Sequence, residues 1–259
     1  MTRTERIVVL LCLTLAAIFA WEALLELADG LSTPVATQGW APDGDRQTYI
    51  DAASRWLAGG GFYLDRQLHG PYEIAFHDIL YPPPALLLFV PFTVLPGALW
   101  YAIPLGIIVG VVAYHRPRPI AWPIIAAAIW WPPVLIHLVS GNPVIWAAAG
   151  LALGTIWPGA SVLAVFKPSL FPFGLLGARH RSWWMALAAL VVLSALFLPM
   201  WPDYLRVVMD SRNPRGIIYS WEEVPLMLVP VVASALRMRR ATAIARTSSR
   251  RVADPSDSD

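Results

Sequence analysis

Residues 119–178 read PIAWPIIAAAIWWPPVLIHLVSGNPVIWAAAGLALGTIWPGASVLAVFKPSLFPFGLLGA, and Lys167 is the one charged side chain in this stretch. An ordinary soluble domain is about 25% charged, so a run of this kind is typical of a chain that crosses a bilayer several times. Lys167 is also the only lysine of the protein. Because a charge at membrane depth costs about 2.5–3.5 kcal/mol on insertion, an intramembrane lysine indicates a group that is paired or functional.

The composition of the whole chain supports this interpretation. Of its 259 residues, 57% are hydrophobic and 14% are charged, which predicts an all-α, polytopic membrane protein. We expect about eight transmembrane helices, with a range of seven to nine, in one unit over residues 1–236. Prolines in and beside these segments predict kinks, half-helices and re-entrant turns. The apolar segments lie near residues 7–28, 80–95, 98–114, 120–138, 142–157, 159–176, 183–200 and 219–236.

The first apolar segment has some features of a signal peptide. It is long, however, carries Glu22 and Glu26, and has no clear small-residue cleavage site. We therefore expect a retained first span. Cys12, the only cysteine, excludes a disulfide within the chain and a cysteine metal cluster.

The distribution of arginines predicts an orientation. The tail, residues 237–259, carries six arginines before its first acid, whereas residues 29–78 hold seven acids and three arginines. The positive-inside rule then places the tail and the basic 179–181 loop in the cytoplasm, and the 29–78 loop outside. With eight spans both termini are cytoplasmic, but Arg116 and Arg118 fall on the outer side, against the rule. We expect the tail to be disordered.

The outer loop is expected to contain a helix between Arg46 and Ala58, with an amphipathic stripe suited to lying on the membrane surface. Gly59-Gly60-Gly61 follows it and is typical of a helix end. A second outer segment, Trp201–Gly216, supplies further polar side chains. A site between the two loops and the outer helix ends is therefore expected. The stripe consists of Tyr49, Ile50, Ala53, Trp56 and Leu57.

Asp45 is the candidate catalytic residue. A carboxylate at the start of an outer helix can take a proton from a sugar hydroxyl, and general-base catalysis contributes about 10²–10⁴ in rate. The alternative role of Asp45 is that of a helix cap, and the same alternative applies to Asp43 and Asp51. These three acids also offer oxygen ligands to a divalent metal, although we expect no metal or other cofactor.

The other candidates are polar or cationic groups near the expected outer helix ends. His69 and His77 can place positive charge beside a phosphate or move a proton, although most loop histidines are inert. Lys167 suits a phosphate as a point charge, with structural pairing or snorkelling as alternatives. Tyr81, before three prolines, and Asn142, in a Ser-Gly-Asn-Pro break, either shape the backbone or face the site. The sequence has no Walker loop, HExxH motif or serine elbow, and nothing indicates nucleic-acid binding.

The order of these elements resembles a short member of glycosyltransferase family 87. That family comprises actinobacterial α-mannosyltransferases with a multi-span GT-C architecture that use polyprenyl-phosphate mannose. The resemblance covers most of residues 43–220. It rests on Asp45-Arg46-Gln47-Thr48-Tyr49, Gly59-Gly60-Gly61-Phe62-Tyr63, Tyr81-Pro82-Pro83, Gly141-Asn142 where the family usually has Gly-Gln, Lys167-Pro168, and the Tyr204 loop leading to Asn213.

The resemblance implies that Asp45 is the general base for an acceptor hydroxyl and that the reaction inverts the anomeric centre. The expected partners are a polyprenyl-phosphate sugar donor and a lipid or glycan acceptor, at the outer face of the plasma membrane. The substrate-binding candidates are Arg46, Tyr49, His69, His77, Tyr81, Asn142, Lys167 and Arg212.

A non-catalytic protein is the competing hypothesis, either a carrier of a lipid-linked sugar or an assembly partner. A carrier is expected to have related halves or ionisable pairs within the membrane. In the sequence only Lys167 and the Glu22/Glu26 pair are of this kind.

Overall fold

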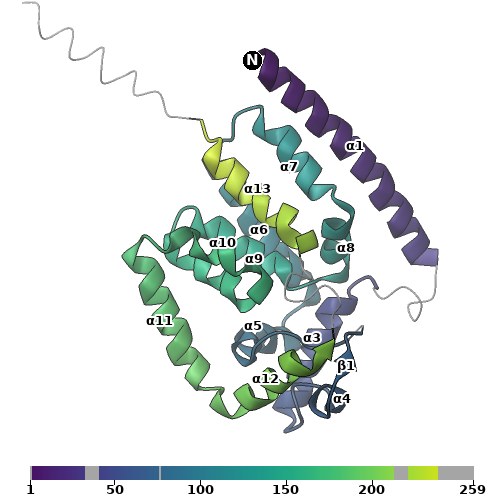
Figure 1. The fold of residues 1–259 in the computed structure, drawn as a ribbon, viewed down its shortest axis with the longest axis vertical. Helices are drawn as coiled ribbons and strands as arrows, with labels where there is room; N and C mark the ends of the chain where they lie inside the picture. Colours follow the sequence, from purple (N-terminus) through teal and green to yellow (C-terminus); the bar gives the residue numbers. More distant parts are fainter. Residues whose placement is uncertain (1, 33–40, 76, 213–220, 239–259) are drawn as a thin grey trace, which may run out of the picture.

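The computed structural model describes residues 2–32, 41–75, 77–212 and 221–238 (Figure 1). Within these ranges the protein is mostly helical, which confirms the predicted all-α class. The strands in the described part are β1 (Tyr72–Glu73) and β2 (Ser211–Arg212), which pair in parallel. Nearly all of the expected tail, and Asn213 of the second outer segment, lie outside the described residues.

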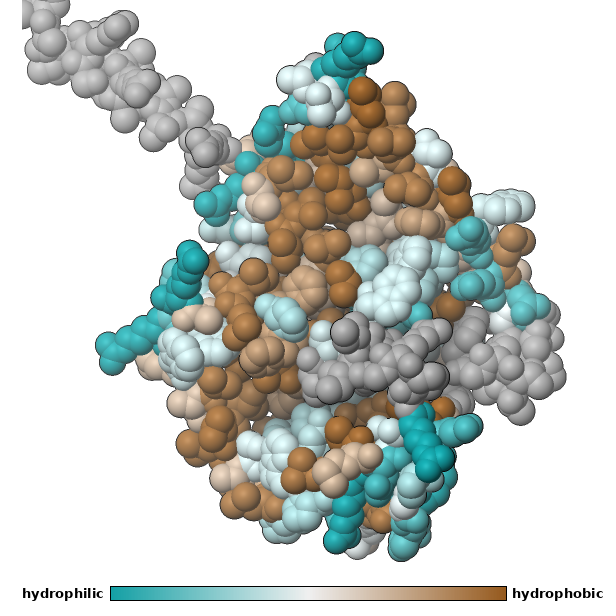
Figure 2. All heavy atoms as spheres, viewed as in Figure 1, coloured by the Kyte–Doolittle hydropathy of each residue, from teal (hydrophilic) through white to brown (hydrophobic). Residues whose placement is uncertain are grey.

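Two helices of the described chain are long and apolar enough to cross a membrane. They are α1 (Arg3–Ser32) and α6 (Gly97–His115). Side chains along α1 point outward with little protein around them, as Leu10, Leu11 and Trp21 illustrate. In Figure 2 apolar atoms dominate the face of the molecule between hydrophilic groups at its top and lower right.

Two further helix pairs are long and apolar enough to cross a membrane only when each pair is counted as one bent span. The first pair is α7 (Ala121–Ile129) and α8 (Pro132–Ser140), bent by 61°. The second is α11 (Arg181–Ala195) and the segment ending in α12 (Trp201–Asp210), bent by 77°. The described chain therefore has two to four candidate spans by length and composition, and the expected count of eight stays a prediction.

The remaining apolar segments are short or broken, as their prolines predict. The helix α9 (Val144–Gly154) covers only part of the expected 142–157 segment. The last segment begins with η8 (Trp221–Glu223), a 3₁₀ turn, and continues as α13 (Val224–Ala235). The expected 80–95 span is a series of short turns: η1 (Pro83–Ala85), α5 (Leu86–Phe89) and η2 (Val90–Thr93).

The segment around Lys167 is a hairpin, in which the end of the second arm lies beside the start of the first. The outgoing arm is η3 (Pro158–Phe166). Ser161 Oγ donates to the Gly174 carbonyl at 3.0 Å, and a Cβ on Gly177 would lie 2.4 Å from the Pro158 carbonyl. Lys167 therefore lies at the tip of a hairpin, where the sequence predicted an apolar span over residues 159–176. The return arm consists of η4 (Pro168–Leu170), α10 (Phe171–Gly174) and η5 (Leu175–Gly177).

Seven arginines of the described residues lie toward one end of the molecule. Arg118 pairs with Glu5 of α1 at 3.5 Å, and Pro117 forms a β-bridge with Arg237, just after α13. Figure 1 shows the start of α1 and the end of α13 together at the top. Arg116 and Arg118 thus lie beside the chain's other basic groups, and their expected place at the opposite end is wrong. We call this the basic end: Arg3, Arg6, Arg116, Arg118, Arg179, Arg181 and Arg237.

The opposite end, which we call the polar end, contains α3 (Gly44–Leu57), α4 (Asp65–Leu68), β1 and α12. The expected stripe of α3 is largely buried inside the protein, since Tyr49 stacks on Phe89 with ring centroids 5.0 Å apart. This face therefore packs on residues 81–92 instead of on a membrane surface. The helix ends as expected before Gly59, which has φ +85°.

Candidate functional site

Asp45 is held by a segment almost a hundred residues away in sequence. It lies in the first turn of α3, and its Oδ2 accepts hydrogen bonds from Ser140 Oγ and Asn142 Nδ2, each at 2.8 Å. The N-cap position belongs to Asp43, so Asp45 does not cap the helix. Both donors bind Oδ2. The Oδ1 atom has no hydrogen-bond partner among the described residues, so it can accept a proton.

The turn between α8 and α9 fixes these two donors. Gly141 has φ +74°, and a Cβ there would lie 2.5 Å from Tyr101 Oη and 2.8 Å from Arg46 Cβ. Trp100 Nε1 donates to the Gly141 carbonyl at 2.8 Å. The side-chain oxygen of Asn142 accepts from the Val144 amide at 3.0 Å, so its NH₂ group is the one that faces Asp45.

Arg46 and Tyr101 hold Asp43, next to this turn. Arg46 donates from Nε and Nη2 to the two oxygens of Asp43, and Tyr101 Oη donates to Oδ1 at 2.8 Å. Partial burial alone would raise the pKa of Asp43, but the hydrogen bonds from Arg46 and Tyr101 outweigh it and lower that pKa. Arg46 is therefore paired with a protein carboxylate beside Asp45.

The aromatic and histidine candidates meet α3 within two turns of Asp45. His77 Nδ1 lies 2.6 Å from Thr48 Oγ1. The Tyr81 ring stands edge-on to Tyr49, with centroids 5.2 Å apart. His77, Tyr49 and Tyr81 thus lie on or against the helix that carries Asp45, and their substrate-binding role stays a prediction.

Lys167 has a partner that the sequence analysis missed. Its Nζ forms an ion pair with Oε1 of Glu223, and the two residues are 6% and 2% exposed. His137 Nε2 lies 3.7 Å from the same Oε1, and Lys167 Nζ lies 5.8 Å from the Tyr81 ring centroid. Glu223 Oε2 is buried, and no hydrogen-bond partner for it is found in the described part of the chain. Structural pairing, one of the alternatives for Lys167, is the arrangement observed.

The two other candidates lie elsewhere in the polar end. His69 Nδ1 is 2.6 Å from the carbonyl of Asp65, in its own helical turn. Arg212 belongs to β2, opposite Glu73 of β1. No contact in the described part of the chain joins either of them to Asp45, so their substrate-binding role stays a prediction.

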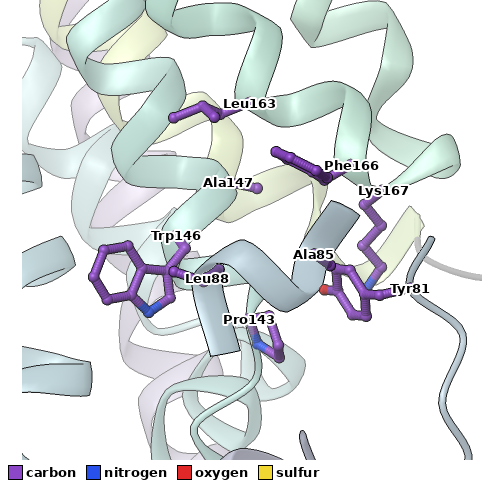
Figure 3. A pocket seen from close by; sticks show the side chains of 9 residues that line it. All are labelled: Tyr81, Ala85, Leu88, Pro143, Trp146, Ala147, Leu163, Phe166 and Lys167. Carbon is purple, nitrogen blue, oxygen red and sulfur yellow. The ribbon is translucent and has the colours of Figure 1, made fainter. Parts of the chain in front are cut away.

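An apolar pocket lies next to the turn that holds Asp45 (Figure 3). It encloses about 500 Å³, its open mouth included. Pro143, in its wall, directly follows Asn142, and Lys167 and Tyr81 supply its polar groups. In Figure 3 the amine of Lys167 points toward the Tyr81 ring. The lining residues are Tyr81, Ala85, Leu88, Pro143, Trp146, Ala147, Leu163, Phe166 and Lys167.

The described residues contain no group of three His, Cys, Asp or Glu side chains that could hold a metal ion. No family model, no curated protein and no solved structure matches the chain.

Proposed function

We propose that the protein is a membrane glycosyltransferase that moves a hexose from a polyprenyl-phosphate donor to a lipid or glycan acceptor, with Asp45 as general base. Mannose is the sugar implied by the family resemblance. One observation carries the proposal: the Asp45 carboxylate is fixed through Oδ2 by Ser140 and Asn142, beside an apolar pocket. A carboxylate held in place by hydrogen bonds can act as a general base when a substrate hydroxyl comes within hydrogen-bond reach of it.

The pocket and the carboxylate together suit an amphiphilic substrate. A sugar needs hydrogen-bonding groups, and a prenyl chain needs an apolar wall that reaches the lipid. The pocket supplies that wall through residues such as Leu88, Leu163 and Phe166, and Leu163 is 44% exposed at its edge. The acceptor hydroxyl would meet Asp45 while the donor chain occupies the pocket.

The chemical step uses Asp45 Oδ1. This atom accepts the proton of the acceptor hydroxyl as the hydroxyl oxygen attacks the anomeric carbon, and the bond from that carbon to the phosphate oxygen breaks. The leaving polyprenyl phosphate takes the electron pair and gains negative charge, which needs stabilisation. Lys167 is paired with Glu223, Arg46 is paired with Asp43, and His77 contacts Thr48 on α3, and these three residues are the candidates for that task.

The arrangement of the helices supports six membrane crossings. In chain order α1, α6, α7 with α8, α9, α11 and α13 run alternately between the basic end and the polar end (Figure 1). The segments 80–95 and 158–177 return to the end from which they start. The positive-inside rule then assigns the basic end to the cytoplasm and Asp45 to the outer face of the plasma membrane. Arg116 and Arg118 now obey that rule.

The donor can be tested with purified protein in liposomes. We expect transfer from polyprenyl-phosphate mannose, release of polyprenyl phosphate, and a product of inverted anomeric configuration by NMR. Transfer from a nucleotide-linked mannose alone, or a product of retained configuration, would contradict the proposal.

A carrier of a lipid-linked sugar is the second candidate, because the structure contains a feature expected of carriers. Lys167 and Glu223 are buried and His137 is half-buried beside them, and ionisable groups of this kind within a membrane mark ion and proton pathways. Movement of the intact lipid-linked sugar across liposomes, with no cleavage of its phosphate bond, would favour this function over transfer.

A further inference from the structure

A second pocket lies at the basic end, far from Asp45. It is formed where α9 and α13 end and where the Lys167 hairpin begins and returns. It encloses about 700 Å³, its open mouth included. The proposed reaction uses no part of it. The lining residues are Leu151, Gly154, Thr155, Pro158, Leu176, His180, Val231, Ser234 and Ala235.

The lining of this pocket is amphiphilic. Leu151, Leu176 and Val231 provide an apolar wall, whereas His180, Thr155 and Ser234 are polar. The Thr155 hydroxyl is already engaged, because it donates to the Ala152 carbonyl at 2.7 Å and contacts His115 Nε2 at 2.7 Å. His180 and Ser234 are therefore the polar lining groups best able to meet a ligand.

The surroundings of the pocket are positive. Arg179 and Arg181 flank His180 in the chain and are exposed. Arg237 follows Ser234 by three positions and is bridged to Pro117. Glu5 is the one acid placed at this end in the described residues, and Arg118 pairs with it. A pocket rimmed by several arginines attracts anions.

Exposed aromatic side chains stand at the same level as the pocket. Trp157 precedes the lining residue Pro158, and Trp184 Nε1 donates to the Ala178 carbonyl at 2.9 Å, two residues before His180. These side chains are 59% exposed, and Tyr114 and Trp122 are 64% and 52% exposed at the neighbouring ends of α6 and α7. Tryptophan and tyrosine concentrate at the headgroup level of bilayers, so the pocket lies where headgroups are found.

We propose that this pocket binds an anionic phospholipid of the cytoplasmic leaflet. The phosphate meets Arg179, His180 and Arg181, and an acyl chain runs along Leu151 and Val231. The ends of α9 and α13 carry partial negative charge, so the phosphate lies on the arginine side of the pocket. This inference rests on the proposed membrane orientation and does not require sugar transfer.

Native mass spectrometry of the full chain in detergent tests the proposal, with phosphatidylglycerol and phosphatidylcholine added in parallel. We expect preferential retention of phosphatidylglycerol, weakened about 30-fold in the Arg179→Gln/Arg181→Gln variant, since each arginine near anionic lipid contributes about a factor of five. The control is Arg206→Gln, which changes an exposed arginine at the polar end and should bind as the wild type does.

A second variant tests the pocket itself. Ser234→Leu fills it without changing charge and should also lower phosphatidylglycerol retention, while a melting curve checks that each variant is folded. Equal retention by all four proteins, or an equal loss in the polar-end control, would overturn the proposal. Displacement of the lipid by millimolar inorganic phosphate alone would overturn it as well, because the ligand would then be a free phosphate. None of these outcomes bears on Asp45, whose transfer assay is separate.

Discussion

At the scale of single residues, two hydrogen-bond donors orient the Asp45 carboxylate. Ser140 and Asn142 both bind Asp45 Oδ2, and Asn142 is itself fixed by the Val144 amide. Hydrogen bonds to a charged group contribute about 1.5–3 kcal/mol each, so neither donor is interchangeable with an apolar side chain.

Replacement of Asn142 should reduce transfer without unfolding the protein. We expect Asn142→Ala to lower kcat about tenfold or more, because Asp45 loses a donor that orients it. Asn142→Gln keeps the amide and should retain more activity than Asn142→Ala. Steady-state kinetics with the lipid donor measures both variants. Equal activity in Asn142→Ala and the wild type would show that this hydrogen bond has no part in the reaction.

Gly141 provides a stability prediction at the same turn. Its φ of +74° and its distance from Tyr101 Oη leave no room for a Cβ, so Gly141→Ala should cost about 1–3 kcal/mol and lower the melting temperature. Gly106, with nothing within 4 Å of its added Cβ, offers a matched control. A Gly141→Ala protein as stable as Gly106→Ala would contradict the geometry described.

At the scale of elements, the Lys167 hairpin is attached to the start of α13 by a buried ion pair. Removal of one partner leaves the other charge buried and unpaired, which costs about 3–5 kcal/mol, whereas replacement of both by apolar groups is often neutral. Trp131 Nε1 donates to the Glu222 carbonyl at 3.1 Å, so α8 also helps to position Glu223. The ion pair and this hydrogen bond together connect three separate segments.

A double-mutant cycle should reveal this structural role. We expect Lys167→Met and Glu223→Leu to destabilise the protein strongly when made singly, and the double variant to recover most of the lost stability. Thermal unfolding in detergent gives the comparison. If Lys167 instead contacts the donor phosphate, the double variant will be stable but inactive, and the transfer assay distinguishes the two roles.

Sequence patterns predicted where helices break better than they predicted which distant residues pair with one another. The proline-rich segments 80–95 and 159–176 indicated broken helices, because proline removes backbone donors, and both segments are broken. Pairing across long sequence distances left no local signal: 97 residues separate Asp45 from Asn142, and 56 separate Lys167 from Glu223. The acidic pair Glu222-Glu223, near the start of the last apolar segment, was the one sign in the sequence of a partner for Lys167.

At the scale of the whole molecule, the alternation of helices between two ends predicts sidedness. In a Cys12→Ser background, we expect Arg118→Cys to react with a membrane-impermeant maleimide only after the membrane is opened, and Asp51→Cys to react in intact cells. An eight-span topology predicts outside labelling for residue 118. Labelling of Arg118→Cys in intact cells would therefore contradict the six-crossing arrangement.

Asp45 lies at the polar end, which the six-crossing arrangement places outside the cell. Asp51 is exposed on the same helix, and within the described ranges it accepts one side-chain hydrogen bond, from Gln47 Nε2 at 2.8 Å. Asp51→Asn is thus a control of equal charge change and equal size, on the same element, without the contacts of the proposed base.

The most direct measurement is sugar transfer from labelled polyprenyl-phosphate mannose by the wild type, Asp45→Asn and Asp51→Asn in matched membranes. The account predicts transfer by the wild type and by Asp51→Asn, and a loss of about a hundredfold or more in Asp45→Asn with the protein still folded and inserted. Transfer by Asp45→Asn at the wild-type rate would contradict the central claim.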